Sequence, residues 1–303
     1  VGGHEHARQV EVVGGRTVVK ADADAWSAAV VTLTLGTEGV TTDADIVDLS
    51  APAVAPDPAV QAAVDAWIAR HAEEFCASKA GAGPDCLAAP LTHAAVDLHA
   101  AELDIRRFET NVGNWVADRA LEAWRDDGVQ VAFVNSGALR INRDIAAGAP
   151  LTRREVEELL PYPSETVRVR LTGALLADVL AHSVEDWTGQ GHFLQVAGLA
   201  FRHDPDTATV TDLTLLTPDG PRPIAPGDTI EAVTVSYLTN PKYGQDGYTM
   251  LRPEHVVGEP GPAVKQLVVD ALDAAGEAGI GPTVEGRICN PQRPGPCLAV
   301  AGE

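Results

Sequence analysis

The 303-residue sequence is poor in basic residues. It carries 22 lysines and arginines against 43 aspartates and glutamates, for a formal net charge of −21. A surface with this balance repels phosphate backbones and anionic headgroups, which argues against nucleic acid or an anionic membrane as a partner. A locally basic pocket can still bind a single phosphate.

Long hydrophobic runs are also absent. No stretch approaches the roughly 20 apolar residues of a membrane-spanning helix, and no basic-then-apolar opening like that of a signal peptide is present. The sequence opens at Val1-Gly-Gly-His4-Glu-His6. We therefore expect it to be the C-terminal part of a longer protein, with any export signal on the preceding part.

Cysteine is scarce, and its spacing excludes a CxxC zinc or redox motif. The four residues form two local pairs, Cys76 with Cys86 and Cys289 with Cys297, each around a Gly/Pro-rich loop. Two interpretations remain open: structural disulfides, which we favour, or four free thiols. Disulfides would predict a secreted, periplasmic or cell-surface protein.

Hydrophobic patterning predicts an α+β fold, with a mixed β-sheet between helices in α/β/α layers. In the first half, residues 10–13 and 16–19 form a hairpin pattern around Gly14-Gly15, 28–35 a strand, and 59–74 a helix whose apolar side holds Val60, Val64, Trp67 and Ile68. Residues 91–107 are interpreted as a second connecting stretch. The expected divisions are 1–50, 51–105 (a linker helix and disulfide loop), 106–281, and a Pro/Gly-rich tail at 282–303.

The most informative stretch runs from Glu109 to Arg140. A helix over 111–124 places Asn111, Asn114 and Asp118 on one face, and Val129–Val134 is an apolar, β-branched run typical of a buried strand. Ligands of such sheets lie outside the carboxyl ends of strands, where Arg140 offers a rigid fork of donors. For the polar helix face, a supporting role is favoured over direct ligand contact.

Further elements are predicted downstream. Thr152 and Glu155 form a capping-box pattern before a helix over 153–160. We expect strands at 166–171, 193–201, 209–216 and 229–237, and helices at 172–187 and 264–275. His182, His192 and His255 have no partner in spacing, and are interpreted as ordinary surface or packed histidines.

Several motifs in this order carry a resemblance to a known family. They are Arg106…Glu109-Thr-Asn-Val-Gly-Asn114, Asn135-Ser-Gly-Ala-Leu-Arg140, Leu160-Pro-Tyr162, Gly191-His-Phe-Leu-Gln195 and Gln245-Asp246-Gly247-Tyr248. Over roughly 106–251 the chain resembles the C-terminal, substrate-specificity domain of the bifunctional metallophosphatase/5′-nucleotidase family. Residues 2–6 resemble the last metal motif, GHxH, of that family's N-terminal calcineurin-like phosphoesterase domain, so residues 1–50 would be the end of that domain.

The resemblance implies a nucleotide-hydrolysing enzyme in which a linker helix joins two domains. The N-terminal domain would use two divalent metal ions, zinc, manganese or similar, to activate water, and the C-terminal domain would bind the nucleoside or nucleotide. The roles implied are metal ligands for His4 and His6, substrate binding for Arg106 and Arg140, base contact for Asn135, base stacking for Tyr162 and Tyr237 (with Tyr243 as the alternative), and ribose contact for Asp246.

The chain departs from the family pattern in ways that affect the expected activity. It has NSGALR for NGGGIR, LPYPS for LPFGN and GQDG for GGDG, and it lacks the remaining metal motifs and the catalytic histidine. We therefore expect the 303 residues alone to be inactive and to work with the metallophosphoesterase domain of the same protein. The alternatives are a non-catalytic nucleoside- or nucleotide-binding module, or a cyclic-nucleotide or nucleotide-sugar hydrolase.

Overall fold

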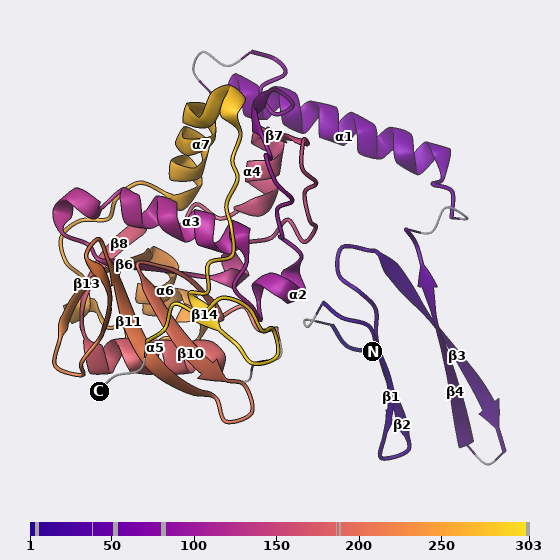
Figure 1. Cartoon of the computed structure of the whole chain (residues 1–303). Helices are drawn as coiled ribbons and strands as arrows, with labels where there is room; N and C mark the ends of the chain where they lie inside the picture. The colour runs from indigo at the N-terminus through magenta and orange to yellow at the C-terminus, as the bar shows by residue number, and fades with distance from the viewer. Residues whose placement is uncertain are drawn as a thin grey trace. The chain divides into compact units, whose positions relative to one another are not determined.

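The computed structural model describes residues 1–3, 6–37, 39–50, 54–79, 83–185, 187 and 189–300. Contacts within the chain define two compact units, Val1–Glu74 and Phe75–Glu303. Each unit is described by itself, and Figure 1 gives the element labels used below.

The first unit contains two antiparallel hairpins. β1 (Gln9–Val13) pairs with β2 (Arg16–Lys20), and β3 (Ser27–Gly36) pairs with β4 (Gly39–Asp48). Gly14 and Gly15 both have positive φ, +57° and +74°, as a two-residue hairpin turn requires. The predicted first hairpin is confirmed, and the strand predicted at 28–35 is the first strand of the second hairpin.

A single long helix, α1 (Pro58–Ala77), follows the hairpins. Asp57 begins it, because its Oδ1 accepts hydrogen bonds from the amides of Ala59 (2.8 Å) and Val60 (3.0 Å). The helix predicted at 59–74 is thus confirmed. Its apolar side, however, is 44–67% exposed at all four predicted positions. No helix among the described residues is long and apolar enough to span a membrane.

The second unit is built on a four-stranded mixed sheet. Its order is β8 (Thr166–Thr172), β13 (Thr229–Val235), β6 (Val131–Asn135) and β9 (Leu194–Ala197). β13 and β6 are parallel, whereas the two outer pairings are antiparallel. Every residue of β6 is buried, so this strand is covered on both faces, as its apolar run predicts.

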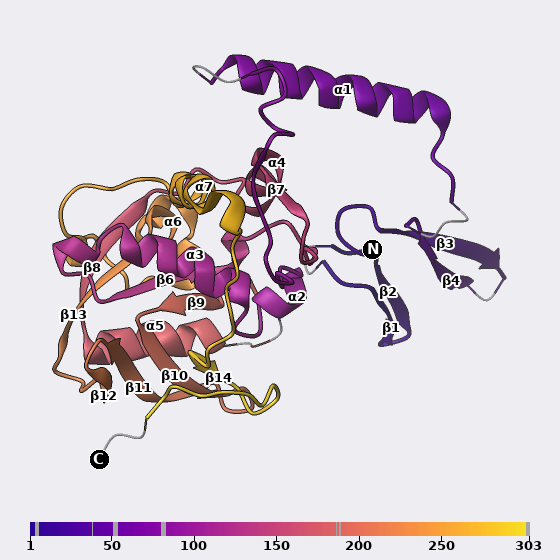
Figure 2. The same ribbon diagram turned by 45° about the horizontal axis from the view of Figure 1, so that its top comes forward.

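Helices cover both faces of this sheet, which confirms the predicted fold class. α3 (Asn111–Glu122) lies on one face with α7 (Val264–Ala275) packed outside it, and α5 (Gly173–Val184) lies on the other (Figures 1 and 2). α5 also contacts a second sheet, whose order is β12 (Gly220–Pro223), β11 (Thr209–Thr217), β10 (Leu199–Asp204) and β14 (Ile288–Cys289).

The single strand predicted at 193–201 is wrong. The chain breaks at Gly198, which has φ +73°, so β9 joins the first sheet and β10 the second. A Cβ on Gly198 would lie 2.1 Å from the carbonyl oxygen of Gln130, which explains the glycine. The strand predicted at 229–237 ends earlier, at Val235, where α6 (Ser236–Thr239) begins.

The remaining elements complete the second unit. β5 (Pro90–His93) pairs with β7 (Pro150–Thr152), α2 (Glu102–Ile105) is a single turn, and α4 (Arg153–Leu159) starts with the predicted Thr152–Glu155 capping box. Residues 91–107, interpreted from sequence as a connecting stretch, contribute Ala94, Leu98 and Ile105 to the core. Both predicted disulfides form, and all four cysteines are paired.

Candidate functional site

The predicted strand-end loop begins at Asn135, the last residue of β6. A 3₁₀ turn over Ser136–Ala138 follows, and the Arg140 amide donates to the carbonyl of Leu159 at 2.8 Å. The Gly137 amide donates to the carbonyl of Gly191 at 2.8 Å, and a Cβ on Gly137 would lie 3.0 Å from that oxygen. Two motifs that are distant in sequence therefore meet backbone to backbone, which fixes the loop.

Asp246 joins two other predicted site residues. Asn135 Nδ2 donates to its Oδ2 at 2.9 Å, and the Tyr237 hydroxyl donates to its Oδ1 at 2.7 Å. Burial, and then the hydrogen bond to Asp246, raise the pKa of Tyr237 to about 12. The Asp246 backbone is in the left-handed region (φ 47°, ψ 32°), a conformation that aspartate tolerates better than most residues.

Hydrogen bonds and ring packing from neighbouring side chains fix the turn that contains Asp246. His182 Nε2 donates to the Asp246 carbonyl at 2.8 Å, and the His182 and Tyr248 rings pack nearly perpendicular to each other with centroids 4.6 Å apart. Gln245 Nε2 donates to the carbonyls of Leu238 (2.9 Å) and Leu251 (3.2 Å). His182 is packed, as one of the predicted alternatives had it, but its contact with this turn had no signal in the spacing of the sequence.

Two predicted arginines share one buried carboxylate. Glu102 forms an ion pair with Arg106, four residues later, and its Oε1 lies 3.9 Å from Arg140 Nη1. Burial lowers the pKa of Arg106 and the charge of Arg140 lowers it further, whereas Glu102 and Asp246 oppose the shift. Sequence reasoning missed Glu102, although its helical spacing from Arg106 was a usable signal.

Aromatic rings stand beside these charges. The Arg140 guanidinium lies 5.7 Å from the centre of the Tyr162 ring, which is 52% exposed. The Tyr237 and Tyr243 rings are 6.4 Å apart and inclined by only 16°, with Tyr243 60% exposed. Tyr237, predicted as a base-stacking ring, and Tyr243, its alternative, are therefore neighbours, and Tyr243 is the more exposed of the two.

The polar face of α3 supports the fold rather than this site. Asn111 Nδ2 donates to the carbonyl of Asp97 (2.8 Å) and Asn114 Nδ2 to that of Thr283 (3.0 Å). Asp118 accepts from both terminal nitrogens of the buried Arg287, at 2.8 and 3.1 Å. The favoured supporting role thus agrees with the geometry, but much of the support goes to the C-terminal segment.

Two further motif residues are structural. The buried Glu109 carboxylate accepts backbone hydrogen bonds from Glu285 (2.7 Å), Gly286 (3.1 Å) and Ile288 (3.1 Å). Gly113 leaves room for Gln195, because a Cβ there would lie 2.2 Å from Gln195 Oε1.

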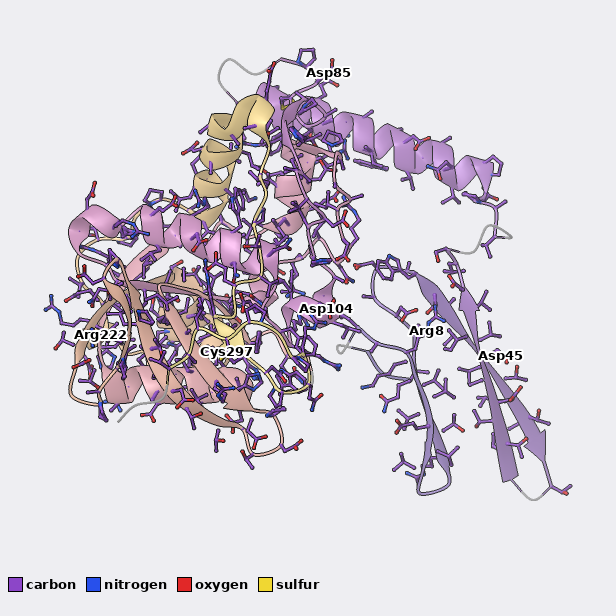
Figure 3. All side chains as sticks on the ribbon, in the orientation of Figure 1. Arg8, Asp45, Asp85, Asp104, Arg222 and Cys297 are labelled. Carbon is purple, nitrogen blue, oxygen red and sulfur yellow. A yellow bond between two sulfur atoms is a disulfide. The ribbon has the colours of Figure 1, made fainter. Side chains whose placement is uncertain are left out.

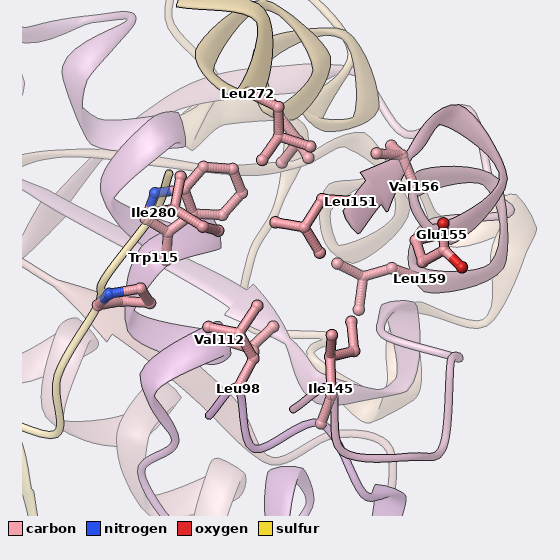
Figure 4. Close-up of a pocket in the computed structure, with 13 residues that line it drawn as sticks. Leu98, Val112, Trp115, Ile145, Leu151, Glu155, Val156, Leu159, Leu272 and Ile280 are labelled. Atoms are coloured by element: carbon pink, nitrogen blue, oxygen red, sulfur yellow. The ribbon is translucent and has the colours of Figure 1, made fainter. Parts of the chain in front are cut away.

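Neither of the two cavities described in this unit contains a predicted site residue. One, of about 30 Å³ between α3, α4 and α7, is lined almost wholly by apolar side chains (Figure 4) and is too small for a nucleoside. The other, of about 400 Å³, lies beside the Cys289–Cys297 loop. There Arg293 stacks on Phe108 at 3.7 Å and pairs with Asp104 at 2.5 Å; Figure 3 labels Asp104 and Cys297.

The predicted metal ligands, His4 and His6, stay a prediction. His4 lies outside the described residues, and His6 is exposed. Among the residues that the structure describes, no group of three or more His, Cys, Asp or Glu side chains could hold a metal ion.

Comparison with known proteins places residues 90–253 in the family described as "5′-nucleotidase, C-terminal domain". Rat 5′-nucleotidase is 28% identical over 211 residues, covering 64% of this chain and 35% of that protein. An uncharacterised Bacillus subtilis metallophosphoesterase, YunD, is 30% identical over 103 residues, 34% of this chain and 21% of that protein.

The same fold occurs in a solved structure, the 5′-nucleotidase precursor of Thermus thermophilus. It superposes with a TM-score of 0.77 at 24% identity, over 95% of this chain and 55% of that one. The chain thus spans about a third or less of the length of the two curated relatives, and about half of the solved structure.

Proposed function

The chain belongs to the family of 5′-nucleotidase C-terminal domains, and from that premise we propose that its second unit binds a nucleoside or nucleotide. The binding residues would be those predicted from sequence: Arg106, Asn135, Arg140, Asp246 and the tyrosines 162 and 237. In this proposal the unit is the substrate-specificity half of a two-metal phosphoesterase that hydrolyses nucleotides.

One observation carries the proposal. Side chains from separate segments of the chain, at Arg106, Asn135, Arg140, Tyr237 and Asp246, interact within one cluster through hydrogen bonds and mutual charge effects. Sugar hydroxyls and ring nitrogens need both donors and acceptors, and the cluster offers both. Tyrosine rings add apolar faces on which a base can stack.

The ring assignments follow from the contacts. Because the Tyr237 hydroxyl is tied to Asp246 and its ring is half-buried, we propose that Tyr243 presents the outer face of this aromatic pair. Tyr162, held against Arg140, would provide the opposing face. Asp246 would accept hydrogen bonds from ribose.

Hydrolysis belongs to the proposed whole protein. The described residues supply too few ligands for a metal centre, so a metallophosphoesterase domain would have to complete it, with His4 and His6 among the ligands of two divalent ions. Such a pair of ions activates water for attack on phosphorus. The two disulfides support a secreted, periplasmic or cell-surface location.

Ligand binding by the chain tests the proposal. In titration calorimetry, at least one of adenosine, guanosine, cytidine, uridine or their 5′-monophosphates should bind. Arg140→Ala should weaken binding by about ten- to a hundredfold, as loss of charged hydrogen bonds predicts. The matched control is Arg143→Ala, whose arginine pairs with Glu158 at 2.7 Å on the surface. Equal weakening by both variants would contradict the assignment.

A second candidate is a binding module with no catalytic role. Both hypotheses predict no turnover of an aryl phosphate by the 303 residues, even with added manganese or zinc. Turnover by the pure chain would contradict both. Nucleotide hydrolysis by a longer natural form would decide for the enzyme.

A further inference from the structure

We propose that Glu102 is a specificity-determining residue: it cancels the charge of one arginine, so that the cluster around Arg106 and Arg140 selects the uncharged nucleoside part of a substrate over its phosphate. The inference rests on the proposed function, and it adds a residue that none of the family motifs contains.

The position of Glu102 suits this role. It is the first residue of α2, and its side chain is only 8% exposed. Its carboxylate forms an ion pair with Arg106, and the same Oε1 lies 3.9 Å from Arg140 Nη1. The amide of Glu102 also donates to Asn142 Oδ1 at 3.0 Å, which ties the turn to the segment after Arg140.

The charges of the cluster sum to zero. The cluster contains two guanidinium groups, of Arg106 and Arg140, and two carboxylates, of Glu102 and Asp246. Arg106 interacts electrostatically with each of the other three groups. A phosphate entering this cluster would lose its hydration and gain no net attraction in return. With Glu102 neutral, the sum would be +1, and an anion would be attracted.

The test compares each nucleoside with its 5′-monophosphate by titration calorimetry. Wild-type protein should bind the nucleoside at least as tightly as the monophosphate. Glu102→Gln should shift the ratio of the two dissociation constants about tenfold toward the monophosphate. Glu102→Asp, which keeps the charge, should preserve the ratio even if both ligands bind less tightly. The control Glu122→Gln, in a surface pair with Arg119, should leave the ratio unchanged.

Competition by inorganic phosphate on wild-type protein gives a second measurement that does not depend on the folding of any variant. Phosphate should not displace the nucleoside at concentrations where the nucleoside binds. Displacement, a wild-type preference for the monophosphate, or the same ratio in Glu102→Gln and wild type would each overturn the role of Glu102 while leaving the proposed function intact. If no nucleoside or monophosphate binds the wild type, the proposed function itself fails.

Discussion

His203 offers a quantitative test of the second unit, because its ring is buried without polar contacts. The residue is 1% exposed on β10, and neither ring nitrogen has a hydrogen-bond partner among the described residues. Trp187, Phe193 and Phe201 lie around it, with ring centroids 5.8–6.4 Å away. Burial lowers its pKa from 6.5 to about 4, with the nearby Asp204 opposing the shift.

The sign and size of the pH effect follow from this shift. Below pH 6.5 the His203 side chain is protonated in the unfolded chain, whereas in the folded chain it stays neutral until about pH 4. The contribution of neutral His203 to the free energy of unfolding is therefore fully present above pH 6.5 and is lost as pH falls toward about 4. The difference of about 2.5 pH units, at about 1.4 kcal/mol each, gives a full loss of about 3.5 kcal/mol, of which about 3 kcal/mol is reached by pH 4.

Urea unfolding followed by tryptophan fluorescence, across the same pH range, measures this loss. His203→Leu removes the titrating group and should flatten the dependence by about 3 kcal/mol relative to wild type. Phe193→Leu disturbs the same cluster without a titrating group, so its cost should not change with pH. If the stability difference between wild type and His203→Leu is constant with pH, the reasoning about His203 is wrong.

Two packing predictions can be checked by the same unfolding measurement. Gly113→Ala forces a Cβ to within 2.2 Å of Gln195 and should cost about 2 kcal/mol despite the better helix propensity of alanine, whereas Gly227→Ala, where a Cβ meets nothing within 4 Å, should cost little. Asp118→Asn leaves the buried Arg287 with Glu285 as its remaining charged partner and should cost about 2 kcal/mol; a loss below half that value would mean that Glu285 or water replaces the Asp118 carboxylate.

Hydrophobic patterning and helix capping predicted much of this fold, because both depend on residues that are close together in the sequence. The apolar run at 129–134 predicted a buried strand, and the Thr152 cap predicted where α4 begins. The break at Gly198 escaped prediction because the apolar pattern continues through it. Its cause is the approach of the Gln130 carbonyl, from the residue just before β6.

The candidate site shows the same division between local and distant causes. A strand-end position and the family pattern indicated Arg140 and Asn135, and the structure brings Asn135 into contact with Asp246. The ion pair of Glu102 with Arg106 lies within one helical turn, so spacing could have suggested it. The approach of Glu102 to Arg140 could not be found in this way, because it depends on the tertiary fold.

The hydrogen bonds between residues 109–118 and the C-terminal segment at 283–288 bear on the order in which the chain is synthesised. Glu109, Asn114 and Asp118 appear early, but their partners at residues 283–288 come near the end. Until that segment has been translated, the Glu109 carboxylate has no backbone amides from which to accept hydrogen bonds. We therefore expect the second unit to close its interior only after residues 283–288 have been translated, so that a product terminated before them would remain open to proteases.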